Sequence, residues 1–245
     1  MEMPKIPPSE DKTSRSLGPY ADLADLFMYP DENLGPKSEK LQAFLDKHYP
    51  EAGGELAAFT DYALKTEVHE LQEIFLRSFD VQAITTLDIG YVLFGDDYKR
   101  GAVLVHMNRE HEQVGNPCYN ELADHLPNVL RLIPLLEDDS FRNELVDRLL
   151  APALRKIIRE FDPSKIKAKG KIYKKHHRTL IDESENFHTI YRLPMLALYA
   201  LIADDFKLTE EIPPGPSSDF LKKIGDEITL ETETESPNIS PSCNP

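Results

Sequence analysis

The side chains with the most obvious chemistry are two cysteines and eight histidines. Cys118 has His111 and His125 seven residues away on either side, which makes a cysteine–histidine nucleophile pair chemically available. No local signature accompanies this pair, and a lone cysteine is more often a small buried apolar residue. We therefore expect no catalytic residue and predict that the protein is not an enzyme.

A second group of potential ligands lies between residues 176 and 188. His176, His177 and His188, with Glu183 and Glu185 between them, carry side chains that bind metal ions. Their spacing matches neither Cys-x-x-Cys nor His-Glu-x-x-His, so it defines no coordination geometry. The first two of these histidines can also simply extend a basic surface loop. We expect no metal ion.

The glycines argue against nucleotide chemistry. None of the 11 glycines has Gly-x-Gly spacing, so the chain lacks both a dinucleotide-binding loop and a Walker loop. The Gly-x-Ser-x-Gly motif of a serine hydrolase is also missing. We expect no cofactor.

The charge is strongly acidic except in one strip. The formal net charge is −15, and a surface of that sign repels nucleic-acid phosphates, so we expect no nucleic-acid partner. Residues 165–178 contain seven basic residues and no acid, and the other residues of 17–206 together carry −17. The strip is either a surface insertion or the site at which a helical scaffold or regulatory protein binds an anionic partner.

Composition divides the chain into three parts. Residues 1–16 and 207–245 are rich in proline and poor in apolar residues, which predicts a flexible N-terminus and a disordered acidic tail. The folded domain is expected at 17–206, with a basic insertion or linker at 162–187. No apolar stretch is long enough to cross a bilayer, and the first residues lack the apolar core of a secretory signal. We expect a cytoplasmic protein without membrane insertion.

Apolar residues recur every three or four positions, which predicts a single all-α helical bundle. The four clearest stripes are Leu23, Leu26 and Phe27; Val68, Leu71, Phe75 and Phe79; Leu122, Leu126, Leu130 and Ile133; and Leu145, Leu149, Ile157 and Ile158. Pro134 and Pro194 lie within apolar runs and are expected to bend or interrupt helices. Asp124 is expected to cap a helix that has Pro127 in its first turn.

Three motifs between residues 70 and 136 carry a family resemblance. They are ELQEIFLRSFDV (70–81), GYVLFGDDYKRG (90–101) and ELADHLPNVLRLIPLL (121–136). In this order they resemble the NarJ branch of the TorD/DmsD family of maturation chaperones for redox enzymes. ADLADLFMYPDENL (21–34) matches the opening helix of that branch, and 191–206 matches its closing helix. The segment 162–187 and the tail after 207 have no counterpart in the family.

The resemblance implies a TorD/NarJ-type helical bundle that acts as a cytoplasmic chaperone. Such a protein binds the N-terminal segment of the apo catalytic subunit of a nitrate-reductase-like molybdoenzyme. It assists insertion of the molybdenum cofactor and assembly, without holding a cofactor of its own. The identity of the client and the oligomeric state stay open.

The same resemblance suggests residues for peptide recognition. The family's DHLP motif falls on 124–127, and its first two residues, here Asp124 and His125, are associated with signal-peptide recognition. Pro127 completes the motif. Tyr91 and Phe94 match aromatic positions of the family, although aromatic residues at helical spacing are expected first of all in the core.

The resemblance implies a client segment that is an amphipathic or apolar helix with basic residues. A helical bundle receives such a helix in an apolar groove, and acids at the rim of the groove attract its charges. We expect Asp88, Asp96, Asp97 and Asp124 to form part of that rim.

Overall fold

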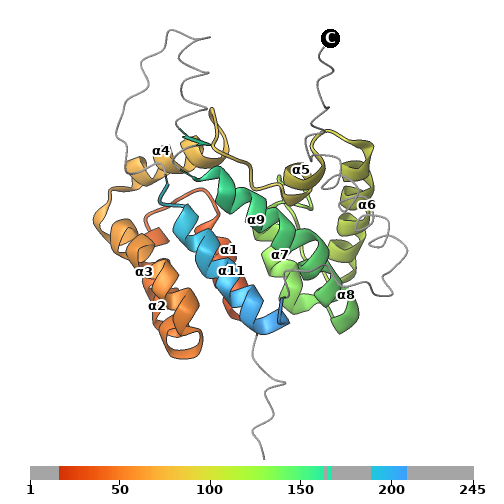
Figure 1. Cartoon of the computed structure of the whole chain (residues 1–245), viewed down its shortest axis with the longest axis horizontal. Coiled ribbons are helices and arrows are strands. Elements are labelled where there is room, and N and C mark those ends of the chain that lie inside the picture. The colour runs from red at the N-terminus through yellow and green to blue at the C-terminus, as the bar shows by residue number, and fades with distance from the viewer. Residues whose placement is uncertain (1–16, 163–164, 167–188, 209–245) are drawn as a thin grey trace, which may run out of the picture.

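The structure is a computed structural model, and it describes residues 17–162, 165–166 and 189–208. Within these ranges the regular secondary structure is helical, which confirms the predicted all-α fold (Figure 1). The predicted flexible N-terminus (1–16), most of the basic insertion (162–187) and nearly all of the acidic tail (207–245) lie outside the described residues. The helices are α1 (Pro19–Leu26), α2 (Leu34–His48), α3 (Pro50–Lys65), α4 (Val68–Phe79), α5 (Ile89–Phe94), α6 (Tyr98–Gln113), α7 (Leu126–Leu132), the 3-10 turn η2 (Ile133–Leu135), α8 (Asp139–Leu145), the π turn η3 (Val146–Leu150), α9 (Ala151–Glu160) and α11 (Arg192–Phe206).

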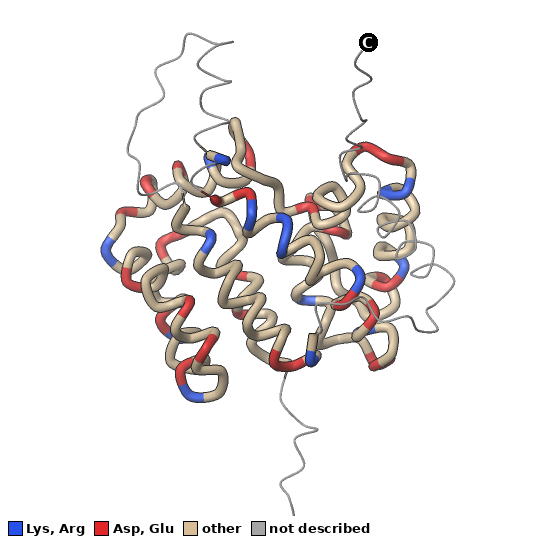
Figure 2. The backbone as a smooth tube through the Cα atoms, in the orientation of Figure 1, with Lys and Arg blue, Asp and Glu red and all other residues tan. Residues whose placement is uncertain are grey.

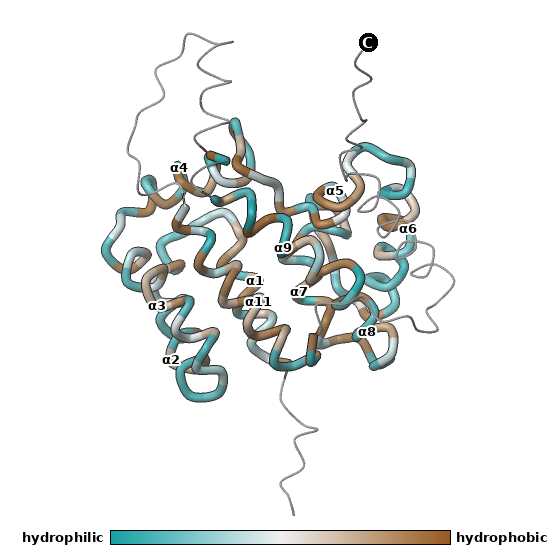
Figure 3. Tube along the Cα trace, viewed as in Figure 1, coloured by the Kyte–Doolittle hydropathy of each residue, from teal (hydrophilic) through white to brown (hydrophobic). Residues whose placement is uncertain are grey.

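The last described helix, α11, lies inside the bundle. Its sequence RLPMLALYALIADDF is apolar around most of its circumference, and a helix of that kind is stable only when neighbours cover it. Helices α3, α9 and α1 pack against it. In Figure 3 the apolar residues gather where α1, α7, α9 and α11 meet. The closing helix therefore joins the first helices to the later ones.

Aromatic rings complete the core at the start of α11. The ring of Tyr191 meets those of Phe59, Phe75 and Phe79 at centroid distances of 5.4, 5.6 and 5.1 Å. Phe79 in turn contacts Phe161, which follows α9. These edge and tilted contacts connect α3, α4 and α9 around one tyrosine.

Proline positions explain several helix boundaries. Pro134 ends α7 and lies in the 3-10 turn η2, as predicted from its place in an apolar run. The prediction for Pro194 is wrong, because this residue lies in the first turn of α11, where its missing N–H needs no acceptor. Pro152 lies in a helical stretch from α8 to α9, and the π turn η3 immediately before it relieves the clash with the preceding turn.

The apolar stripes predicted the buried faces with one clear exception. Leu23, Leu26 and Phe27 are fully buried, and Leu71, Phe75 and Phe79 are buried in α4. Leu122 is 46% exposed because α7 begins only at Leu126, so the third stripe starts one turn later than expected.

The two buried tyrosines that flank α11 differ in one hydrogen bond. The hydroxyl of Tyr20 donates to Asp205 at 2.8 Å, whereas that of Tyr191 has no hydrogen-bond partner among the described residues. An unsatisfied buried hydroxyl costs free energy. We expect Tyr191→Phe to raise the free energy of unfolding by about 1 kcal/mol and Tyr20→Phe to lower it by about 1 kcal/mol. Urea denaturation followed by circular dichroism measures both, and a loss of stability in Tyr191→Phe would contradict the argument.

Candidate functional site

Two of the motifs found in the sequence meet in space. Asp88 and His125, 37 residues apart, form an isolated antiparallel bridge between the segment before α5 and the segment before α7. The N–H of Ile89 donates to the carbonyl of Asp124 at 3.0 Å, and the N–H of Leu126 donates to that of Leu87 at 2.8 Å. The GYVLFG helix and the DHLP helix therefore begin side by side.

Asp124 lies beneath this bridge, fully buried. Its Oδ2 accepts hydrogen bonds from the N–H of Gly90 at 3.1 Å and from Nε of Arg100 at 3.3 Å. Its Oδ1 has no hydrogen-bond partner among the described residues. Burial, and secondarily the charge of Asp88, raise the pKa of Asp124, although Arg100 opposes the shift.

Two predictions for Asp124 are corrected by this geometry. His125, not Asp124, occupies the N-cap position of α7, and its side chain makes no capping hydrogen bond. A carboxylate with no exposed surface also does not form part of a rim that faces a bound peptide. Pro127 lies in the first turn of α7, as predicted, and is buried.

Arg100, at the start of α6, links both aspartates. Its Nη2 donates to Asp88 Oδ2 at 2.9 Å, and its guanidinium carbon lies 5.2 Å from the centre of the Tyr91 ring. Asp88 Oδ1 also lies 3.1 Å from Nδ1 of His125. Burial alone would raise the pKa of Asp88, but the hydrogen bond and charge of His125, with those of Arg100, lower it. Asp88 therefore stays ionised, and the positive charge of Arg100 compensates its negative charge.

Sequence reasoning missed Arg100. The available signal was its place within the motif GYVLFGDDYKRG, directly before Gly101. The first glycine of the motif, Gly90, lies close to the Asp124 carboxylate. A Cβ on Gly90 would lie 2.5 Å from Asp124 Oδ2. A larger residue here would have to displace the carboxylate to which the first turn of α5 donates its N–H.

The other predicted residues differ in their exposure and contacts. Asp96 and Asp97 are exposed before α6, and Asp97 Oδ1 caps that helix by accepting from the N–H of Lys99 at 3.0 Å. Phe94 is buried, as expected for a core residue, whereas Tyr91 is 41% exposed, so the core prediction is wrong for it. The four aspartates therefore do not form one rim.

The end of α6 has a second buried anchor, His111. Its Nε2–H donates to the carbonyl of Ala123 at 3.0 Å, and its Nδ1 accepts from the side-chain amide of Asn116 at 2.9 Å. Both ring nitrogens are occupied, so His111 does not activate Cys118. Burial raises the pKa of the Cys118 thiol, which is the opposite of what a nucleophile needs.

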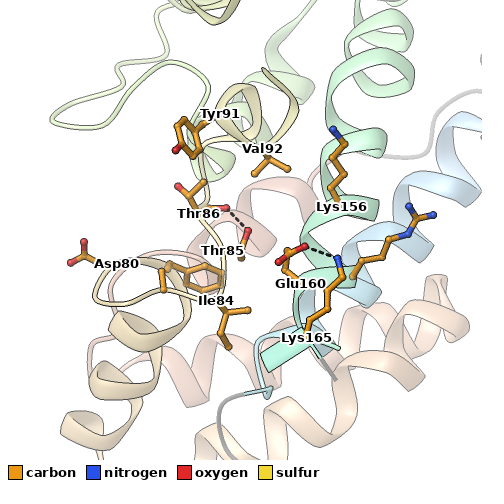
Figure 4. Close-up of a pocket in the computed structure, with 12 residues that line it drawn as sticks. Asp80, Ile84, Thr85, Thr86, Tyr91, Val92, Lys156, Glu160 and Lys165 are labelled. Carbon is orange, nitrogen blue, oxygen red and sulfur yellow. Dashed lines mark hydrogen bonds and ion pairs between the residues drawn. The ribbon is translucent and has the colours of Figure 1, made fainter. Parts of the chain in front are cut away.

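Two clefts of opposite charge flank this anchored region. We call the first the basic cleft: it lies between the 79–92 segment and α9, has a volume of about 740 Å³, and is drawn in Figure 4. Figure 2 shows basic residues along α9. The charged residues that line the basic cleft are Asp80, Lys156, Arg159, Glu160 and Lys165.

The second cleft, called the acidic cleft, lies between α6 and the 135–144 segment. Its volume is about 780 Å³. The lining combines apolar Val114, Leu135, Leu136 and Phe141 with four carboxylates, those of Glu110, Glu137, Asp138 and Glu144, and with His106. No lysine or arginine is among the described residues that line it. Leu135 is 45% exposed, so apolar surface is open to a partner here.

The described residues contain no group of three or more His, Cys, Asp or Glu placed to hold a metal ion. The histidines at 176, 177 and 188 and the glutamates at 183 and 185 lie outside the described residues. Over the same described part of the chain, no helix combines the length and apolar character needed to cross a bilayer.

Comparison with known proteins assigns no family. No family model matches the chain, and no protein of curated function matches it. The resemblance to the TorD/NarJ chaperones therefore rests on the sequence motifs alone.

The Arg100–Asp124 pair should contribute more to stability than a surface ion pair. Removing Arg100 leaves a buried carboxylate without its cation, so we expect Arg100→Met to lower the free energy of unfolding by about 2–4 kcal/mol. Arg77→Met, which breaks the exposed pair with Glu73, should cost less than about 1 kcal/mol. In the double variant Arg100→Met/Asp124→Asn, part of the loss should be recovered. Urea denaturation tests all three, and equal losses for the two single variants would contradict the role of burial.

His111 should make stability depend on pH. Burial lowers the pKa of His111 below 6.5, although the bond to Ala123 opposes this, so the unfolded chain takes up the proton more readily. Its contribution is therefore fully present above about pH 6.5 and falls as the pH drops toward the folded pKa. We expect the free energy of unfolding to fall more steeply between pH 7.5 and 5.5 in the wild type than in His111→Gln. Parallel slopes would show that His111 does not contribute.

Proposed function

We propose that the protein is a cytoplasmic chaperone for a molybdoenzyme. It binds the N-terminal segment of the apo catalytic subunit of a nitrate-reductase-like enzyme and assists molybdenum-cofactor insertion and assembly. The motifs at 70–81, 90–101 and 121–136 support this assignment. The observation that carries the proposal is the acidic cleft, because its chemistry suits a basic amphipathic segment.

The acidic cleft offers both parts of such an interaction. Leu135 and Phe141 supply apolar contact, which gives affinity, and the surrounding carboxylates attract basic side chains and set their orientation. Three carboxylates already have intramolecular partners: Asp138 caps α8 through the N–H groups of Ser140 and Phe141, Glu144 lies 3.4 Å from Arg148, and Glu110 lies 3.6 Å from Nε2 of His106. The exposed Glu137 is therefore the acid best placed for a client, and Glu110 follows it because its partner His106 carries a charge only when protonated.

In this proposal the DHLP motif positions the cleft instead of contacting the client. Helix α6 is held at its start by Arg100 on Asp124 and at its end by His111 on Ala123. The face of α6 that carries His106, Glu110 and Gln113 lines the acidic cleft. A substitution at Asp124 would act on client binding through the placement of α6.

The basic cleft supports a second candidate function. A helical scaffold or regulatory protein could bind an anionic partner through the strip 165–178, and Lys165, one of the two residues of that strip that the structure describes, lines the cleft. Exchanging the basic residues of 165–178 for neutral ones should abolish partner binding in that case. The same exchange should leave client-peptide binding nearly intact if the chaperone function is correct.

Client binding should depend on the charges of the acidic cleft. We expect Glu110→Gln/Glu137→Gln to weaken binding of a basic amphipathic N-terminal client peptide by about 3- to 10-fold at low salt. The salt dependence of the dissociation constant should also decrease. Isothermal titration calorimetry measures both quantities.

Two matched variants give this experiment its controls. Glu39→Gln, on α2, changes an exposed acid outside the cleft and should leave the affinity unchanged. Asp96→Asn tests the rim predicted from sequence. Weaker binding in Asp96→Asn with unchanged binding in the cleft variant would move the site to the turn before α6, and unchanged binding in every variant would exclude an electrostatic role for these acids. Failure of the full-length apo subunit to co-purify with the wild type would reject the chaperone function itself.

A further inference from the structure

The basic cleft contains cations that the described fold leaves unpaired. Lys156 and Arg159 lie three residues apart on α9, both exposed, and neither has an ion pair among the described residues. Lys165, just beyond the helix, pairs with Glu160 at 2.7 Å. Surface cations are common, but these lie along one wall of a hollow, which concentrates their field.

The opposite wall of the cleft is different in character. Figure 4 shows Thr85, Thr86 and Tyr91 across the opening from Lys156 and Lys165. Phe79, Ile84 and Val92 add apolar surface between the walls. Asp80 also belongs to this wall, and in Figure 4 its carboxylate points away from the opening. A ligand that fills this cleft would therefore carry carboxylates toward α9 and apolar side chains toward the apolar surface between the walls. An acidic peptide with interspersed apolar residues has that chemistry.

The chain itself contains such a peptide. Residues 226–235, DEITLETETE, hold five acids and no base, with Ile228 and Leu230 between the acids. This segment follows Leu208, the last described residue. We propose that segment 226–235 of the C-terminal tail binds the basic cleft of its own chain.

The distance that the tail must cover is short. Phe79, which lines the cleft, contacts Tyr191, and Tyr191 comes immediately before α11. The 15 residues of α11 lead away from this point over about 22 Å, and the tail begins near its far end. An 18-residue coil, the length from Leu208 to Asp226, spans about 25 Å on average.

The covalent connection favours the tail over a separate anion. A linker of this length holds the segment at an effective concentration in the millimolar range, so even weak contacts keep the cleft occupied. Carboxylates of the tail would then shield Lys156 and Arg159 from other anions. The acidic cleft shares no lining residue with the basic cleft, so the inference does not depend on the proposed chaperone function.

Zero-length crosslinking of the dilute full-length chain tests the inference directly. A carbodiimide joins a lysine amine to a carboxylate with loss of water only when the two groups touch, and peptide mass spectrometry locates the bond. We expect Lys156 and Lys165 to join Glu227, Glu231, Glu233 or Glu235 within one chain. Such products should exceed those of the exposed Lys47 on α2 by about 5-fold or more.

Charge variants of the full-length chain provide the matched comparison. Glu231→Gln/Glu233→Gln/Glu235→Gln should shift the amide NMR signals of Thr85, Thr86 and Tyr91, whereas Glu210→Gln/Glu211→Gln, also in the tail, should not. The proposal would be overturned by crosslinks that join two chains, by crosslinks confined to lysines 167–175, or by yields at Lys47 equal to those at the cleft. Unchanged client-peptide affinity in the triple variant would leave the chaperone function intact in each case.

Discussion

The buried carboxylate of Asp124 is the constraint on which the second half of the fold depends. Burying a charge is costly unless hydrogen bonds and an opposite charge replace water. Here the N–H of Gly90 and the guanidinium of Arg100 replace it, and these groups come from α5 and α6. One side chain therefore fixes three segments, because any displacement of α5, α6 or α7 would leave the carboxylate without its partners.

The two clefts follow from how helices divide their faces. On α6, Val103, Met107 and His111 are buried, while His106, Glu110 and Gln113 face the acidic cleft. On α9, Leu154 and Ile157 enter the core, while Lys156 and Arg159 face the basic cleft. The hydrogen bond from Arg100 to Asp124 holds the start of α6 in place. The aromatic contacts around Tyr191 hold the end of α9. The two clefts share no lining residue, so the proposed client and the proposed tail segment would not compete for one surface.

Much of the fold could be predicted from periodicity, because an apolar stripe must be covered wherever it occurs. The boundaries that went wrong have local causes. Leu122 keeps helical spacing but precedes the bridge at His125, so α7 begins after it. Pro194 lies in an apolar run but starts a helix, and the π turn before Pro152 left no sequence signal that distinguishes it from an ordinary helix.

The sequence by itself determined that the described part of the chain is all-α and that the net charge is −15. Only the tertiary structure decided what the charged residues do. A residue type specifies the charge that a side chain carries, but folding decides which opposite charge it meets and how much water remains. Asp124 is fully buried and accepts a hydrogen bond from Arg100, so its role is structural. Glu110 and Glu137 lie outside the sequence motifs, and the fold places them in the lining of an open cleft.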